Sequence, residues 1–205
     1  MVRRLAAIYD CEPEAISLHP SGMAALHRAL ELVCDADPTR PVLQIGFPYV
    51  DVLKLPQMVF AGAELLLDDR AASVQSALDS LRPAAVVVEV PSNPLLRCID
   101  LAVIAKLAHQ RNIPVIADDT IGSGLNVDAL PHVDLVFSSL TKSFAGRGDV
   151  LAGSLVLSPH SRWHAQLIDA ARQRPPLAPL ADGDATVLEQ GSRDVADRIP
   201  RLNAN

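Results

Sequence analysis

The sequence is poor in aromatic residues, cysteine and basic charge. Among 205 residues there are four phenylalanines, two tyrosines and one tryptophan, and the three cysteines form no Cys-x-x-Cys pair. Neither a disulfide framework nor a zinc cage is therefore expected. Lysine and arginine together number 18 against 24 acidic residues, for a net charge of -6. This balance argues against a nucleic-acid partner, because such partners select a basic face.

Long hydrophobic runs are missing as well. No apolar stretch reaches the roughly 18 to 20 residues that cross a bilayer, and the start Met-Val-Arg-Arg-Leu-Ala-Ala-Ile lacks the core of a signal peptide. We therefore expect a cytoplasmic protein with no membrane partner. The hydrophobic content of 49% is ample for a single large core.

The order of apolar segments predicts an α/β fold. Strand and helix patterns alternate along most of the chain, including a helix near 50–61 that Pro56 should strain or interrupt, and this favours a mainly parallel sheet with helices on both faces. The connection from Gly148 to Leu151 is too short for a crossover helix, so the last strand should run antiparallel to its predecessor. The expected strands are 15–19, 41–46, 64–67, 84–90, 114–117, 133–138 and 151–157.

The C-terminal part predicts a change in organisation. A helix is expected over 161–172, followed by a proline-rich break and then one polar helix over 184–203. We interpret 1–174 as one large domain, 175–183 as a linker and 184–205 as the start of a helix that leads towards a further domain. His160 and His164 lie four residues apart without a third ligand, so no metal site is expected.

Polar residues end three of the expected buried strands. Lys142 follows the apolar run that starts at Val133, Asp118 ends the strand at 114–117, and Asn93 follows the strand at 84–90. Taken alone, Lys142 could be a solvated charge that closes a strand. Because the carboxyl ends of parallel strands share one edge, where ligands bind, we expect these side chains to meet.

A possible anion site lies at the start of an early helix. The strand at 15–19 leads into Ser21, Gly22 and Met23, where free N–H groups and the helix dipole point the same way. The alternative is that Ser21 serves only as the N-cap. Tyr49 follows the strand at 41–46. Hydroxyl groups stand near the other strand ends, on Thr120, Ser139 and Thr141.

An amine, a buried carboxylate, an aromatic plate and an anion pocket are what pyridoxal phosphate requires. The amine of Lys142 can condense with the aldehyde, and Asp118 can keep the pyridine nitrogen protonated. An opposite charge in contact typically lowers a carboxyl pKa by about 1 to 3 units, so the two charges would support each other. In this interpretation Tyr49 stacks on the ring and Asn93 donates to the ring hydroxyl oxygen. The phosphate would be held by Ser139, Thr141, Gly22 and Met23.

Four segments, in order and spacing, resemble the trans-sulfuration (Cys/Met metabolism) family of pyridoxal-phosphate enzymes. They are Pro-Ser-Gly-Met-Ala-Ala (20–25), Glu-Val-Pro-Ser-Asn-Pro (89–94), Ala-Asp-Asp-Thr (117–120) and Ser-Leu-Thr-Lys-Ser-Phe-Ala-Gly-Arg-Gly-Asp-Val (139–150). The resemblance implies an aspartate-aminotransferase-like fold of type I, a seven-stranded mixed sheet with one antiparallel strand. It implies that Lys142 is the Schiff-base lysine, Asp118 the pyridinium partner and Tyr49 the stacking ring. Ser21 and Thr120 lie in the same motifs and complete the expected cofactor-binding set.

The chain also departs from the family pattern. Asp119 stands where Asn is usual, Ser143 where Tyr is common, and Val50-Asp-Val52 replaces a more usual Gly-Gly-Thr. Family members carry an N-terminal arm and a C-terminal domain, so the resemblance covers the large cofactor domain only. The full-length family implies a homo-oligomer, either a dimer or a tetramer.

The resemblance favours one reaction and leaves others open. The tail at 187–195 resembles cystathionine γ-synthase-like members, which implies γ-replacement on an O-acylated homoserine with cysteine as the incoming thiol. A cystathionine or methionine γ-lyase is the alternative enzyme. A different class of alternative is a truncated, inactive cofactor-binding domain or one half of a split enzyme.

Overall fold

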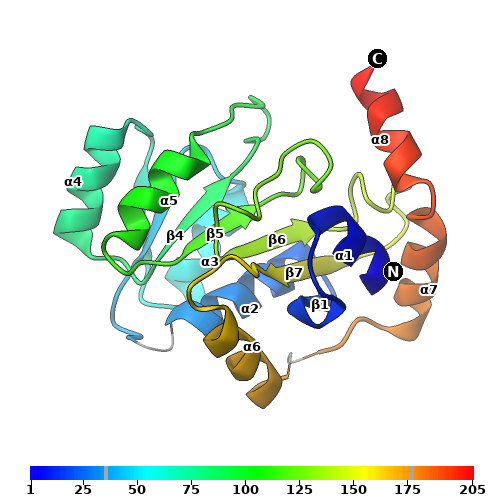
Figure 1. Ribbon diagram of the computed structural model, residues 1–205, viewed down its shortest axis with the longest axis horizontal. Coiled ribbons are helices and arrows are strands. Elements are labelled where there is room, and N and C mark those ends of the chain that lie inside the picture. Colours follow the sequence, from blue (N-terminus) through cyan, green and yellow to red (C-terminus); the bar gives the residue numbers. More distant parts are fainter. Residues whose placement is uncertain (35–36, 176–177) are drawn as a thin grey trace.

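Seven strands form one sheet through the middle of the molecule (Figure 1). The computed structural model describes residues 1–34, 37–175 and 178–205. The strands follow the order β1-β7-β6-β5-β4-β2-β3. Among the paired strands described, β7 runs antiparallel to both of its neighbours, β1 and β6, and every other pair is parallel. The predicted α/β fold with one antiparallel strand is thus confirmed. The bounds are β1 (Ile16–His19), β2 (Val42–Ile45), β3 (Ala63–Leu66), β4 (Ala85–Glu89), β5 (Val115–Asp118), β6 (Leu135–Ser139) and β7 (Gly153–Leu157).

Helices cover both faces of this sheet (Figure 1). One apolar layer contains side chains of α1 (Val2–Tyr9), α4 (Ala71–Leu81), α5 (Leu101–His109), α7 (Asp182–Gly191) and α8 (Val195–Asn203). The other contains side chains of α2 (Gly22–Cys34), α3 (Val50–Val59) and α6 (His164–Gln173). A short 3₁₀ turn, η1 (Pro13–Ala15), joins α1 to β1.

The strand β4 shows why two layers form. Val86 and Val88 pack in one cluster, whereas Ala85 and Val87 pack in the other, and all four side chains are fully buried. Successive side chains of a strand point to opposite faces, so a strand that is apolar at every position needs cover on both. Burying each large apolar side chain stabilises the fold by roughly 1.5 to 3 kcal/mol.

Pro56 does not interrupt α3, which continues to Val59. A proline inside a helix cannot donate to the carbonyl four residues earlier, here that of Val52. That carbonyl instead accepts a hydrogen bond from the buried Gln44 side chain, with 2.6 Å between Nε2 and O. A side chain of β2 therefore replaces the missing helical bond, which a local pattern could not reveal.

The C-terminal tail differs from the single helix expected over 184–203. Two helices are present instead, and α7 ends at Gly191, before the buried Ser192. The Arg4 side chain of α1 donates to Ser192 Oγ at 2.7 Å and pairs with Glu189. The fully buried hydroxyl and this partner hold the chain where it changes direction.

The remaining helix expectations need smaller corrections. α6 begins at His164 rather than at residue 161, so His160 precedes the helix. Residues 176 and 177 of the expected linker lie outside the described residues. The helix α7 begins at Asp182, which is inside the span 175–183 expected for the linker. The division into a domain and a linker stays a prediction. In the described part of the chain, no helix has both the length and the apolar character needed to cross a membrane.

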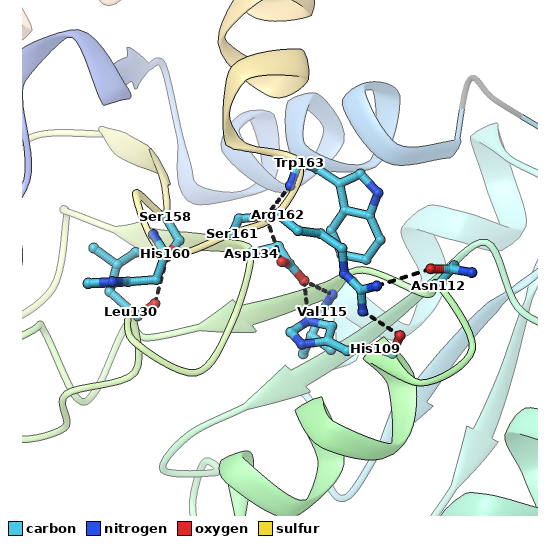
Figure 2. A network of polar contacts seen from close by, with 10 residues as sticks. All are labelled: His109, Asn112, Val115, Leu130, Asp134, Ser158, His160, Ser161, Arg162 and Trp163. Atoms are coloured by element: carbon cyan, nitrogen blue, oxygen red, sulfur yellow. Dashed lines mark hydrogen bonds and ion pairs between the residues drawn. The ribbon is translucent and has the colours of Figure 1, made fainter.

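A polar network lies at the amino end of β6 (Figure 2). Asp134 precedes this strand and is 1% exposed. Its carboxylate accepts hydrogen bonds from Val115 N at 2.7 Å and Ser161 Oγ at 2.7 Å, and it contacts His109 Nε2 at 2.8 Å. This one acid therefore joins β5, α5 and the loop before α6.

Candidate active site

A cavity of about 540 Å³ opens at the carboxyl ends of the central strands. Its volume lies within the range of small-molecule sites, roughly 300 to 1,000 Å³. All ten residues expected at the site line it: Ser21, Gly22, Met23, Tyr49, Asn93, Asp118, Thr120, Ser139, Thr141 and Lys142. The fold therefore brings together an amine and a carboxylate that are 24 positions apart in the sequence.

Asp118 ends β5 and is 4% exposed. Its Oδ1 atom accepts hydrogen bonds from Thr120 N at 3.0 Å and Thr120 Oγ1 at 2.6 Å. Burial nevertheless raises the pKa of Asp118 to about 6, because the bonds from Thr120 offset only part of the lost hydration. A cation placed in the cavity against this carboxylate would relieve that cost.

Thr120 links two strand ends. Its Oγ1 atom donates to Asp118 and accepts a hydrogen bond from Ser139 N at 2.9 Å. The ends of β5 and β6 are thereby tied through one hydroxyl. The tie fixes the carboxylate relative to the segment that carries Lys142.

The start of α2 lies unusually close to β6. A Cβ atom on Gly22 would stand 2.9 Å from Ser139 Cβ, so only glycine allows this approach. Ser21 caps the helix as expected, with its Oγ accepting from Ala24 N at 3.1 Å. This bond does not use the N–H groups of Gly22 and Met23, two residues that line the cavity at the positive end of the helix.

Lys142 lies in a tight turn after β6. Ala145 N donates to Leu140 O, and Gly146 N donates to Lys142 O, each at 2.9 Å. Arg198 of α8 donates to the carbonyl of Phe144 at 2.8 Å. The Thr141 hydroxyl accepts from Ala152 N at 3.2 Å, so part of its hydrogen-bonding capacity serves the turn.

Tyr49 and Asn93 come from loops at the rim. Tyr49 precedes α3 and is 45% exposed, and Asn93 is also exposed. Asp51 lies close to Tyr49, and its charge and a side-chain hydrogen bond raise the pKa of the tyrosine. An exposed ring at the mouth of a cavity is free to cover a flat ligand.

Seven further residues line the cavity that the sequence interpretation did not select: Asp51, Val52, Glu89, Ile121, Phe137, Ser143 and Leu151. Glu89 is the most informative of them. It is 6% exposed and ends β4, directly beside Asp118 in the parallel register. Its place at the end of an apolar run was the signal that could have identified it.

Asp119, the departure from the expected Asn, belongs to the supporting structure. Its Oδ2 atom accepts from Tyr9 Oη at 3.0 Å and from Gly124 N at 2.6 Å, and this closes a turn against α1. Its Oδ1 atom is buried without a partner. Burial raises the pKa of Asp119 to about 8.

The residues present fit pyridoxal phosphate. A buried carboxylate with a raised pKa suits a ring nitrogen that carries a proton, and a helix start with uncommitted N–H groups suits a phosphate. Lys142 supplies the amine in the same cavity. In the described residues no group of three or more His, Cys, Asp or Glu side chains could hold a metal ion.

Comparison with known protein families gives a match over nearly the whole chain. The family model described as "Cys/Met metabolism PLP-dependent enzyme" matches residues 2–205. Among solved structures, cystathionine gamma-synthase from Xanthomonas oryzae pv. oryzae is similar, with a TM-score of 0.79 and 24% identity. The similarity covers 95% of this chain and 50% of that one, and it shows the fold.

Curated relatives differ in their activities. Cystathionine gamma-synthase of Neurospora crassa is 36% identical over 97% of this chain and 33% of its own length. Alanine racemase ungC of Aspergillus violaceofuscus is 38% identical over 98% of this chain and 32% of its own length. The chain thus spans about a third of the length of these relatives.

Proposed function

The chain belongs to the Cys/Met metabolism family of pyridoxal-phosphate-dependent enzymes, and we propose that it forms the cofactor-binding domain of an enzyme that acts on sulfur amino-acid precursors. The reaction we propose is γ-replacement, in which cysteine displaces the acyl group of an O-acylated homoserine. The single observation that carries the proposal is the shared cavity of Lys142 and Asp118.

The bound cofactor would supply an electron sink for a carbanion at the substrate α-carbon. Asp118 would hold the negative charge that keeps the ring nitrogen protonated. Its own pKa, raised to about 6 by burial, would fall again beside that cation. Lys142 would hold the cofactor covalently when no substrate is bound, and its freed Nζ would carry protons between substrate carbon atoms.

Other side chains would bind and orient. Tyr49 would stack on the ring, and Asn93 would donate to the ring hydroxyl oxygen. The N–H groups of Gly22 and Met23 would bind the phosphate at the start of α2. Hydroxyl groups near the same end would add donors, from Ser21, Ser139 and Thr141, while Thr120 would keep Asp118 in place.

Similarity to Neurospora crassa cystathionine gamma-synthase supports the choice of γ-replacement. An alanine racemase is similar to the same extent, so this choice depends on measurement. The γ-lyase alternative would give a keto acid from cystathionine or methionine. The inactive-domain alternative would give cofactor binding with no turnover.

Reduction with borohydride in the presence of pyridoxal phosphate tests the cofactor site. The expected result is a label on the peptide that contains Lys142, found by mass spectrometry, and none in Lys142→Ala. Lys106 lies on α5 and is a matched internal control, since it should remain unlabelled. A wild-type chain that takes up no label would end the proposal.

The reaction is tested with O-succinyl- or O-acetylhomoserine and cysteine. The expected product is cystathionine, and keto acid without cystathionine would favour the γ-lyase alternative. Turnover by the 205-residue chain at the rate of full-length relatives would exclude the inactive domain.

We also propose a homo-oligomer, dimer or tetramer, for the complete protein. Large apolar side chains are exposed beside the cavity, including Phe47 at 52%, Val50 at 49% and Leu151 at 64%. Such neighbouring exposure is typical of surfaces that another protein surface covers. Light scattering of the purified protein would reveal a stable monomer, which would contradict this.

A further inference from the structure

Arg198 of α8 joins a distant part of the chain to the turn that carries Lys142. Its side chain is 17% exposed, whereas that of Arg201, three residues later on the same helix, is 72% exposed. Its Nη2 atom donates to the carbonyl oxygens of Ser143 at 3.1 Å and Phe144 at 2.8 Å, the first two residues after Lys142. The guanidinium is therefore directed into the protein, at the segment that follows the lysine.

The other terminal nitrogen of Arg198 binds the junction of the two C-terminal helices. Its Nη1 atom donates to the carbonyl oxygen of Gly191, the last residue of α7, at 3.2 Å and pairs with Asp194, which precedes α8. A guanidinium holds several N–H donors in one rigid plane, so the two nitrogens fix their acceptors relative to each other. The turn after Lys142 is thereby tied to the helix junction.

The backbones on the two sides of this contact approach closely. A Cβ atom on Gly191 would stand 2.7 Å from the carbonyl oxygen of Ala145. A Cβ atom on Gly146, whose φ is +80°, would stand 2.6 Å from Cζ and 2.7 Å from Nε of Arg198. That Nε atom is buried and has no hydrogen-bond partner. Glycine at both positions therefore leaves room for the guanidinium and the turn to meet.

The turn's own hydrogen bonds do not replace this contact. Its backbone bonds to the carbonyls of Leu140 and Lys142 lie within the hairpin between β6 and β7. The N–H of Lys142 itself has only a long bond, 3.4 Å to the carbonyl oxygen of Ser139. These bonds close the turn but do not fix it against the helices. The bonds from Arg198 use two other carbonyls, and charge-assisted bonds of this kind are stronger than neutral ones.

We propose that Arg198 is a positioning residue, which holds the backbone after Lys142 so that the lysine amine meets the aldehyde of the cofactor. The inference rests on the proposed function for its purpose, whereas the hydrogen bonds exist in the cofactor-free protein. None of the described residues that line the cavity belongs to α8. The helix would therefore act on the site through the turn alone.

Arg198→Met tests the contact directly. It retains the aliphatic stem and removes every N–H donor. Arg201→Met is the matched control, since it also removes one positive charge from α8 but at an exposed position, where the arginine bonds to Asp197 O at 3.2 Å. Neither substitution leaves a buried charge.

A second pair of variants tests the same contact from the side of the turn. Gly146→Ala places a methyl group where the guanidinium lies, and the flexible arginine should be displaced. Gly148→Ala is its control, because φ is +68° there but a Cβ atom would meet nothing within 4 Å. Both variants carry similar backbone strain, so their difference reports the displaced arginine. If Arg198→Met does not fold, as circular dichroism would show, this pair decides.

Amide hydrogen exchange of the cofactor-free protein is the first measurement. The Ala145 amide, which donates to Leu140 O, should exchange at least tenfold faster in Arg198→Met and in Gly146→Ala than in the wild type. In Arg201→Met and Gly148→Ala it should stay within about threefold of the wild type. Unchanged exchange in both Arg198→Met and Gly146→Ala would overturn the positioning role.

Two ligands then separate positioning from a general loss of structure. The amine of Lys142 and the aldehyde of pyridoxal phosphate form a C=N bond with release of water, and borohydride reduces that bond by adding hydride. Pyridoxamine phosphate has an amine in place of the aldehyde and cannot form this bond. In Arg198→Met the rate of labelling of Lys142 should fall at least tenfold, while affinity for pyridoxamine phosphate stays within about threefold of the wild type.

The outcomes distinguish the two proposals. Equal labelling in the wild type and Arg198→Met, or a parallel loss of labelling and of pyridoxamine phosphate binding, would overturn the positioning role alone. A wild-type chain that takes up no label would overturn the proposed function, whatever the exchange rates show.

Discussion

Buried acids lie at both ends of the sheet, but they differ in whether their carboxylate oxygens have hydrogen-bond partners. At the amino end, Asp134 has three hydrogen-bond partners, and Figure 2 shows them converging on one carboxylate. At the carboxyl end, Glu89 and Asp119 each have a buried oxygen with no partner. A satisfied buried acid joins elements of the fold, whereas an unsatisfied one costs free energy that only a ligand or a proton relieves.

The number and origin of hydrogen-bond partners therefore distinguish a structural acid from a candidate functional acid when both are equally buried. Asp134 is 1% exposed and Asp118 is 4% exposed, so burial alone does not distinguish them. Asp134 meets donors from three elements, whereas the donors to Asp118 Oδ1 both come from Thr120. Buried acids with raised pKa values, such as those at the carboxyl end, are typical of functional sites.

Asp134→Ala should produce the largest effect on stability. The substitution leaves the buried N–H of Val115 and the half-buried donors of His109 and Ser161 without their acceptor. The expected loss is about 3 to 5 kcal/mol in the free energy of unfolding. Equilibrium denaturation in urea measures it. A loss below about 1 kcal/mol would show that the network in Figure 2 is not structural.

Asp118→Asn should stabilise the cofactor-free protein, whereas Asp134→Ala destabilises it. Because burial raises the Asp118 pKa from 3.8 to about 6, its charged form is disfavoured in the cofactor-free protein. The variant should therefore be more stable at pH 8, by about 1 to 3 kcal/mol, while it binds pyridoxal phosphate at least 100-fold more weakly. Asp134→Asn is the control, since it should lose stability and retain affinity. If Asp118→Asn were less stable than the wild type, the proposed difference between the two ends of the sheet would be wrong.

The stability of the cofactor-free protein should depend on pH in one direction. The pKa values of Asp118, Glu89 and Asp119 are raised to about 6, 7 and 8, so the folded state holds more protons than the unfolded state above about pH 4. Stability should therefore fall as pH rises from about 5 to 8, since the opposite shift of His19, whose pKa is lowered to about 4, involves one group against three.

Asp119→Asn sharpens this pH prediction. It removes the group with the highest of the three pKa values and should flatten the decline between about pH 6 and 8 by 1 kcal/mol or more. Urea midpoints across the range measure it, with wild type as the reference. Parallel curves for the two proteins would contradict the assignment.

Arg162→Gln should give the smallest effect. The guanidinium lies 4.6 Å from the centre of the Trp163 ring and donates to Asn112 Oδ1 at 3.1 Å, at the solvent side of the Asp134 network (Figure 2). Its loss should cost about 0.5 to 1 kcal/mol. Arg162→Lys retains the positive charge but not the planar guanidinium with its several N–H donors, so it should recover only part of the lost stability. Thermal unfolding of the three proteins measures the difference.

Local pattern was sufficient for most of the fold and for where the site lies. Apolar runs such as that of β4 determine strands because every position is buried, and the short link before β7 determines its direction. Because parallel strands end at one edge, Asp118 and Lys142 could be placed together from the sequence. The roles of these residues stay predictions.

Only the tertiary structure decided how buried polar groups are satisfied. Arg4 meets Ser192 across 188 positions, Tyr9 meets Asp119 across 110, and Gln44 replaces the helical bond that Pro56 lacks. The pattern of apolar residues does not predict such pairs, because each pair depends on which distant segment packs beside the polar group. The sequence therefore determined the strands and their shared edge through local burial, and folding alone decided which acids found partners and which, like Glu89, were left facing the cavity.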